Sequence, residues 1–387
     1  MENSDSIIKL SFNQDNSCFS VATETGFKIY QTYPFKGPIE RNMNGGIGAV
    51  EMIYKSNFLA MIGGGEAPLF NNNKVVIWDE NKSRFISDLK FLTNVINIKL
   101  KKDLLFVVCE DRIYIFNLNT YDAIYTIDTG KNLKGYIAIN NDPTFTVMAY
   151  PSIKGLDNVT LKHFKNKKNI IDIAQDYIIS FMTINYDGTL LATSNEKGTL
   201  IKIFSCFDGN FLMLFRRGHE KVENIYLSFD NENKFMAVTS SKGTIHIFSL
   251  KSIILKLKEN EKAKNEKDNC SGKNIIKNIE KNKKEELKQK EENLDDFEKE
   301  ENINIFNIFN ENDDKLKNNN KEKLPENSKS FLGKEKGFAK FKIKPQKNIC
   351  AFVRSNLLII IAYDNKYYQV EIDITKGVCK LLKEEKI

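Results

Sequence analysis

The sequence predicts an all-β protein, and within that class a seven-bladed β-propeller of the WD40-like kind. Three observations carry this prediction. Short β-branched and aromatic runs recur between turns rich in Gly, Asn and Asp. Two hairpins of very similar sequence start 45 residues apart. The chain outside one polar insertion also has the length of seven such units.

The strand-forming runs are spread over the whole chain. Clear examples are KVVIWD at 74–79, LLFVVCEDRIYIFNL at 104–118 and LLIIIAYDNKYYQVEI at 357–372. Each longer run has an apolar strand, a polar turn and a second strand. This pattern is typical of antiparallel hairpins that bury at least one face.

The repeat is clearest in two segments. LATSNEKGTLIKIF starts at Leu191, and MAVTSSKGTIHIF starts at Met236. A period of 40 to 45 residues with four strands in each unit is typical of a propeller. We expect the seven blades to start near Ser6, Gly48, Thr93, Lys134, Ile178, Val222 and Lys347.

Residues 251–336 differ from the rest of the chain because they consist mostly of Lys, Glu, Asn and Asp. Such a segment buries too little apolar surface to offset its ordering entropy, so we expect a long disordered loop. It falls inside blade six, between a third strand at 244–248 and a fourth at 337–343. Residues 1–250 and 337–387 are then one propeller.

Composition and motifs argue against several classes of protein. The six cysteines form no C-x-x-C pair and there are three histidines, so we expect neither a metal site nor a disulfide framework. The chain has no P-loop, G-x-S-x-G or H-E-x-x-H motif, so we predict that it is not an enzyme and needs no cofactor. The N-terminus resembles no signal peptide, and the longest apolar run, Leu357–Ala362, is far too short to span a bilayer. These features favour a cytoplasmic protein.

The candidate ligand-binding residues surround an arginine pair, Arg216 and Arg217, in the segment FLMLFRRGHE. The preceding run reads as the outermost strand of blade five. Neighbouring residues on a strand point to opposite sides, so the two guanidinium groups are expected to face separate pockets. Hydroxyls of the hairpins at 194–199 and 240–244, with Lys202 or His246, would complete two phosphate sites.

At this point the sequence resembles a known family. FRRG, preceded by LLATSNEKGTLIKIF and followed by GTIHIF, is similar to the PROPPINs, the WIPI-type seven-bladed propellers. MIGGGEAPLFNNNKVVIWD at 61–79, KGFAKFKI and DNKYYQVEIDITKGVC extend the resemblance over the chain outside the insertion. It implies binding of phosphatidylinositol 3-phosphate and phosphatidylinositol 3,5-bisphosphate at two sites on the propeller edge.

The resemblance also implies the residues of both sites. The second site matches at Arg217, Ser240, Thr244 and His246. The first matches at Arg216 and Thr199, but Asn195 stands where the family often has Ser, Lys202 where it has Arg, and Gln175 where it has His. We therefore expect the first site to be the weaker or altered one.

Two further regions follow from the resemblance. In the family, a long loop of blade six dips into the bilayer, which here indicates INIFNIF, with Ile303, Ile305, Phe306, Ile308 and Phe309 as the inserting residues. Loops of blades two and three recruit autophagy proteins, including a bridge-like lipid-transfer protein. The matching residues here are Pro68, Leu69 and Phe70.

The expected protein is thus a phosphoinositide effector of autophagy and membrane remodelling, monomeric in solution, that binds no nucleic acid. It would be peripheral on preautophagosomal, endosomal or vacuolar membranes, or on a plastid membrane. The alternative is a WD40-like protein-interaction scaffold without lipid specificity, whose basic edge binds phosphopeptide or nucleic acid. The adjacent arginines favour the lipid effector, because a pair on opposite faces of a strand suits two headgroups.

Overall fold

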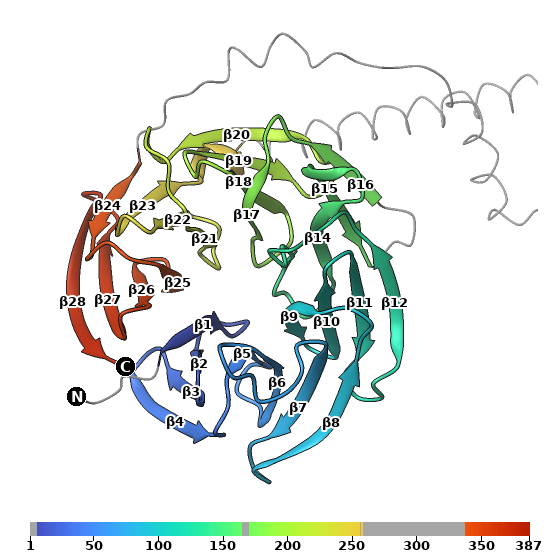
Figure 1. The fold of residues 1–387 in the computed structure, drawn as a ribbon. Helices are drawn as coiled ribbons and strands as arrows, with labels where there is room; N and C mark the ends of the chain where they lie inside the picture. The colour runs from blue at the N-terminus through green and yellow to red at the C-terminus, as the bar shows by residue number, and fades with distance from the viewer. Residues whose placement is uncertain (1–5, 165–169, 256, 258–336) are drawn as a thin grey trace, which may run out of the picture. The chain divides into compact units, whose positions relative to one another are not determined.

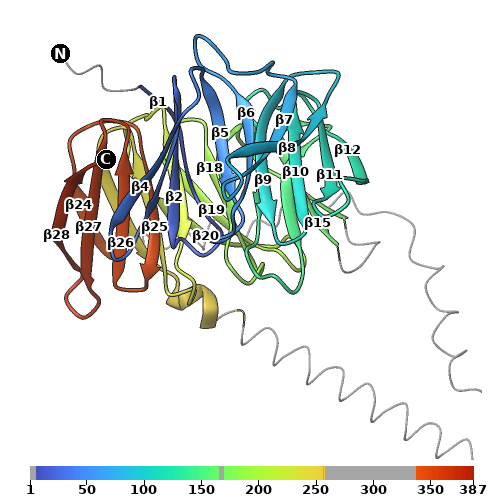
Figure 2. The ribbon, with the colours of Figure 1, turned by 90° about the horizontal axis from the view of Figure 1, so that it is seen from below.

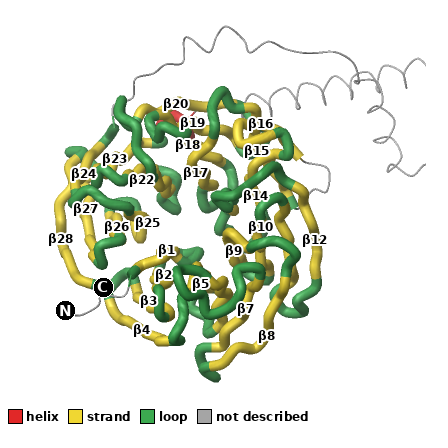
Figure 3. Tube along the Cα trace, viewed as in Figure 1, coloured by secondary structure: helices red, strands yellow, loops and turns green. Residues whose placement is uncertain are grey.

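The computed structural model describes residues 6–164, 170–255, 257 and 337–387. Within these residues the chain forms seven four-stranded antiparallel sheets arranged around a central axis (Figure 1). Strands and loops make up almost all of it, with one short helical segment at 251–255 (Figure 3). The fold class predicted from the sequence, a seven-bladed β-propeller, is confirmed.

Each blade is a run of four consecutive strands, ordered from the axis to the rim. Blade one holds β1 (Ile7–Phe12), β2 (Cys18–Thr23), β3 (Gly26–Gln31) and β4 (Lys36–Asn42). Blade two holds β5 (Ile47–Met52), β6 (Phe58–Gly63), β7 (Lys74–Asp79) and β8 (Arg84–Lys90). Blade three holds β9 (Val95–Lys101), β10 (Leu104–Cys109), β11 (Arg112–Asn117) and β12 (Ala123–Asp128). Blade four holds β13 (Ala138–Ile139), β14 (Val147–Ser152), β15 (Gly155–His163) and β16 (Ile170–Ala174).

The remaining three blades follow the same plan. Blade five holds β17 (Ile179–Ile184), β18 (Leu190–Asn195), β19 (Leu200–Ser205) and β20 (Phe211–Arg216). Blade six holds β21 (Ile225–Phe229), β22 (Phe235–Ser240), β23 (Thr244–Ser249) and β24 (Ala339–Lys342). Blade seven holds β25 (Asn348–Arg354), β26 (Leu357–Ala362), β27 (Lys366–Asp373) and β28 (Val378–Lys386).

Burial follows position within the blade. Strand β10 is buried at all but its first residue, and β26 at every residue, because middle strands are covered by a neighbouring blade on both faces. Outermost strands such as β4 and β8 are mostly exposed. The core is therefore a series of interblade layers, and Figure 2 shows the blades from the side, standing next to one another around the ring.

The ring closes without exchange of strands between the first and last blades, since β1–β4 and β25–β28 are each complete sheets. Side chains make the closure instead. The hydroxyl of Tyr367 in blade seven donates to the carbonyl of Thr32 in blade one at 2.8 Å, and Asn16 Nδ2 donates to the Phe352 carbonyl at 3.0 Å. The Tyr367 ring also packs on Phe35, with centroids 4.3 Å apart.

The insertion predicted at 251–336 lies almost wholly outside the described residues, and so do the five residues of the INIFNIF segment. On either side of it, β23 and β24 pair in register from Thr244↔Lys342 to Ile247↔Ala339. The residues after the insertion therefore complete the sheet of blade six.

Candidate functional site

The arginine pair lies at the outer edge of blade five. Strand β20 ends at Arg216, which is exposed, whereas Arg217 is 7% exposed. Phe215 packs against Phe248 of blade six, with ring centroids 4.8 Å apart. Arg217 follows Phe215 by two residues, so both side chains lie on the blade-six side and Arg216 lies on the blade-four side. By this alternation, the two guanidinium groups lie on opposite sides of the blade-five edge.

Arg217 is held by backbone carbonyls. Its Nε donates to the Gly198 carbonyl at 2.6 Å and an Nη donates to the Glu220 carbonyl. Gly198 adopts a left-handed conformation (φ +63°), and a Cβ there would lie 2.4 Å from the Val222 side chain. Burial lowers the pKa of Arg217, which nonetheless remains a cation.

Strands β22 and β23 bring polar groups of blade six to the same side. His246 pairs with Val238, which has the same orientation as Ser240, and Thr244 lies two residues before His246. Ser240 Oγ is buried and has no hydrogen-bond partner in the described part of the chain. Burial, with the charges of Lys340 and Arg217, lowers the pKa of His246 to about 4. The structure thus gathers the four residues predicted for the second site.

Sequence reasoning missed two residues on this side. Lys340 pairs with His246 and Lys342 pairs with Thr244, so both lysines share the face of the predicted site. The alternation in AKFK, where lysines alternate with Ala339 and Phe341, is the signal that could have found them. They raise the positive charge beside Arg217.

The blade-four side is arranged differently. Lys202 forms an ion pair with Asp176, and its Nζ lies 4.7 Å from the centroid of the Tyr177 ring. Gln175 accepts a hydrogen bond at Oε1 from Thr193 at 3.3 Å, while its Nε2 is buried without a partner among the described residues. The predicted cation of the first site therefore already has an acidic partner, which sequence reasoning did not identify.

The hairpin of blade five also uses Asn195 internally. Asn195 Oδ1 accepts from the backbone N–H of Thr199 at 2.8 Å and of Leu200 at 3.0 Å. Its Nδ2 donates to Thr199 Oγ1 at 3.2 Å. Both the oxygen and the nitrogen of this amide therefore stabilise the turn. Asn195 and Thr199 hydrogen-bond to each other and hold the hairpin of the predicted first site in place.

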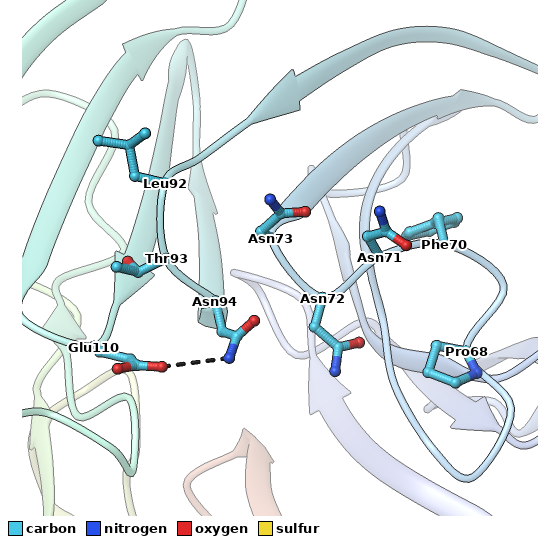
Figure 4. Close-up of a pocket in the computed structure, with 9 residues that line it drawn as sticks. All are labelled: Pro68, Phe70, Asn71, Asn72, Asn73, Leu92, Thr93, Asn94 and Glu110. Atoms are coloured by element: carbon cyan, nitrogen blue, oxygen red, sulfur yellow. Dashed lines mark hydrogen bonds between the residues drawn. The ribbon is translucent and has the colours of Figure 1, made fainter.

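A third region lies between blades two and three, where a pocket of about 580 Å³ includes Pro68 and Phe70 in its lining (Figure 4). Phe70 packs edge-to-face on Phe85, with centroids 6.2 Å apart. Leu92 on the opposite wall is 94% exposed. Leu69 does not line the pocket and packs against the core between blades one and two. Of the three residues predicted to bind partners, two are therefore available to a ligand here.

No helix in the described ranges is long and apolar enough to cross a membrane. No group of His, Cys, Asp and Glu in the part of the chain that the structure describes is placed to hold a metal ion.

Comparison with known proteins gives consistent matches. A family model described as PROPPIN matches residues 6–269. Autophagy-related protein 18e of Arabidopsis thaliana is 34% identical over 258 residues, which are 64% of this chain and 67% of that protein. Autophagy-related protein 18 of Komagataella pastoris is 30% identical over 283 residues, which are 64% of this chain and 52% of that protein. The chain thus spans between about half and two-thirds of these curated relatives.

Solved structures agree on the fold. Kluyveromyces lactis Hsv2 superposes with a TM-score of 0.67 at 19% identity, covering 99% of this chain and 100% of that chain. A structure described as a complex of KlAtg21 with the coiled-coil of AgAtg16 gives a TM-score of 0.65 at 18% identity, covering 99% of both chains. At this identity the likeness shows the propeller and nothing more specific.

Proposed function

The chain belongs to the PROPPIN family of autophagy-related β-propellers, and from this premise we propose that it is a phosphoinositide effector. It binds phosphatidylinositol 3-phosphate, phosphatidylinositol 3,5-bisphosphate or both on membranes, at sites on either side of Arg216 and Arg217. It acts by binding and not by catalysis, as a monomer, and its compartments are the preautophagosomal, endosomal, vacuolar or plastid membranes.

The observation that carries the proposal is the buried hydroxyl of Ser240. A buried polar atom without a partner is costly in a folded protein and is usually explained by a missing ligand or water. This hydroxyl lies on the same side as Arg217 and His246, where an anion would meet a fixed guanidinium. Among the described residues, only Nε and one Nη of Arg217 have hydrogen-bond acceptors, so a phosphate oxygen can accept from the other Nη.

The two sides of the arginine pair are proposed to differ in strength. The blade-six side combines Arg217 with Lys340 and Lys342, whereas Lys202 on the blade-four side is already paired with Asp176. Two headgroup contacts on one membrane multiply the effective affinity even if one of them is weak. INIFNIF, outside the described residues, would add an apolar contact with the bilayer.

The pocket beside Pro68 and Phe70 is proposed as the surface that recruits autophagy partners, a bridge-like lipid-transfer protein among them. Its exposed Leu92 and its position away from the arginine pair leave it accessible while the protein is on a membrane.

Flotation with vesicles tests the function. The Ser240→Ala variant should bind vesicles that contain phosphatidylinositol 3-phosphate about tenfold more weakly, because it loses one hydrogen bond to a charged phosphate. It should fold normally, since that hydroxyl has no partner to lose. The matched control is Ser241→Ala at the next position. Equal binding by both variants, or no preference of the native protein for these vesicles, would favour the scaffold alternative.

A further inference from the structure

The central channel of the propeller carries an excess of positive charge. A cavity of about 600 Å³ lies along the innermost strands of the blades. The charged residues that line it are Lys9, Glu51, Lys99, Lys134, Glu223 and Lys347. Lysines outnumber acids by two, and the low-dielectric walls of a narrow channel concentrate the resulting field.

The one buried acid on this wall is already neutralised. Glu51 on β5 is 2% exposed, and its Oε1 accepts from Lys99 Nζ at 2.6 Å and from Ser11 Oγ at 2.9 Å. Its charge is therefore satisfied directly by one lysine and one hydroxyl, and among the described residues it forms no ion pair with Lys9 or Lys347.

Lys9 and Lys347 have only neutral partners. Lys9 Nζ donates to Asn97 Oδ1 at 2.6 Å, and Asn97 Nδ2 donates to the Gly135 carbonyl at 2.9 Å, which fixes the amide with its oxygen toward the lysine. Lys347 Nζ lies 4.2 Å from the centroid of the Tyr363 ring. Among the described residues, no carboxylate lies within 4.0 Å of either ammonium group.

Lys9 is also destabilised as a cation by its surroundings. The pKa of Lys9 is lowered to about 8, mainly by burial and also by the charges of Lys99 and Lys347, while the charge of Glu51 opposes this shift. The side chain is nevertheless half-buried and lines the cavity, so a solute in the channel can reach it. An anion at this position would offset the repulsion among the three lysines.

We propose that the channel binds a small soluble phosphate-type dianion between Lys9 and Lys347, with Lys99 adding positive charge while it stays paired with Glu51. We call these three residues the channel lysine cluster. They converge from blades one, three and seven, because β1 and β9 lie on the inner wall and Lys347 directly precedes β25. Ammonium groups bind phosphate as point charges from several directions, which suits a cluster without a planar guanidinium.

This site is separate from the sites beside Arg217. The channel lysine cluster lies on or next to innermost strands, whereas Arg217 follows β20, an outermost strand. The ligand of the channel is therefore proposed to be a free anion, and binding of vesicles should not depend on it.

Calorimetric titration of the full chain with inorganic phosphate, at constant ionic strength set with sodium chloride, tests the proposal. The native protein should bind one phosphate, and Lys9→Met should bind it on the order of tenfold more weakly, because it loses one charge-assisted hydrogen bond. The matched control is Lys36→Met, which removes an exposed lysine from β4 of the same blade. Lys347→Gln, which changes an exposed side chain, provides a second variant if Lys9→Met does not fold.

The pH dependence gives an independent readout. Sulfate keeps its charge between pH 7 and 9.5, so any change in its affinity over this range comes from titration of groups on the protein. Its affinity for the native protein should fall as Lys9 loses its proton above its pKa of about 8. The Lys9→Met variant should show a flatter profile over the same range.

Three results would overturn the proposal. One is a native protein that shows no more heat of binding with phosphate than with sodium chloride at the same ionic strength. Another is equal phosphate binding by the native protein and Lys9→Met. The third is phosphate binding that is lost in Ser240→Ala and kept in Lys9→Met, which would put the anion beside Arg217. Normal flotation of Lys9→Met would support separate sites, and its loss would contradict them.

Discussion

Replacing Asp176 with Asn should strengthen binding on the blade-four side of the arginine pair. Asp176 holds Lys202 in an ion pair, and the hydrogen bond from Lys202 keeps the pKa of Asp176 below its usual range. An incoming phosphate must displace this carboxylate and also meets its negative charge. The Asp176 side chain is 73% exposed, so the pair is worth only about 0.2–1 kcal/mol.

We therefore expect a gain of about 1 kcal/mol in the binding of phosphate at this side, or about fivefold in affinity. The cation itself should stay in place, because the Nζ of Lys202 lies 4.7 Å from the centroid of the Tyr177 ring. The stability of the protein should change by less than about 1 kcal/mol, since the carboxylate of the pair is solvent-exposed.

The assay is a vesicle titration with phosphatidylinositol 3-phosphate in the Ser240→Ala background, where the blade-six side is weakened. The matched control is Asp172→Asn on β16, which removes the same charge from an ion pair with Lys154 at 3.0 Å. A gain of equal size in both variants would reflect net charge alone. Unchanged or weaker binding by Asp176→Asn would refute the idea that Asp176 competes with the ligand.

Two further predictions concern stability. The pKa of His246 is about 4 in the folded protein and about 6.5 in the unfolded chain, so the unfolded chain binds the proton more readily. The contribution of His246 to the free energy of unfolding is therefore present above pH 6.5. The free energy of unfolding should fall by about 2–3 kcal/mol as the pH falls to 4.5. Urea denaturation at both pH values should show a smaller loss for His246→Phe, and an equal loss would contradict this assignment. Tyr367→Phe should cost about 1–2 kcal/mol, because the carbonyl of Thr32 is left buried without its donor. Its control, Tyr125→Phe on outer strand β12, should cost little, and equal losses would show that the bond does not close the ring.

The sequence was sufficient to predict the propeller because each blade is built from local hairpins. The expected blade starts lie within about four residues of the observed first strands, for example Ile178 against Ile179 and Lys134 against Ala138. Alternation along a strand also predicted that Arg216 and Arg217 point to opposite sides, which depends only on the pleat.

Contacts between blades were decided by the tertiary structure. The partner of Lys202 is 26 residues away, and the hydroxyl of Tyr367 reaches a carbonyl 335 residues away. The first contact joins β19 to the segment between blades four and five, and the second joins blade seven to blade one and depends on how the ring closes. The closure also brings Lys9 and Lys347, near opposite ends of the chain, into one channel wall. The sequence repeat determines each blade separately, because each blade is made of local hairpins. Lys9 and Lys347 come to line one channel only when the seventh blade packs against the first.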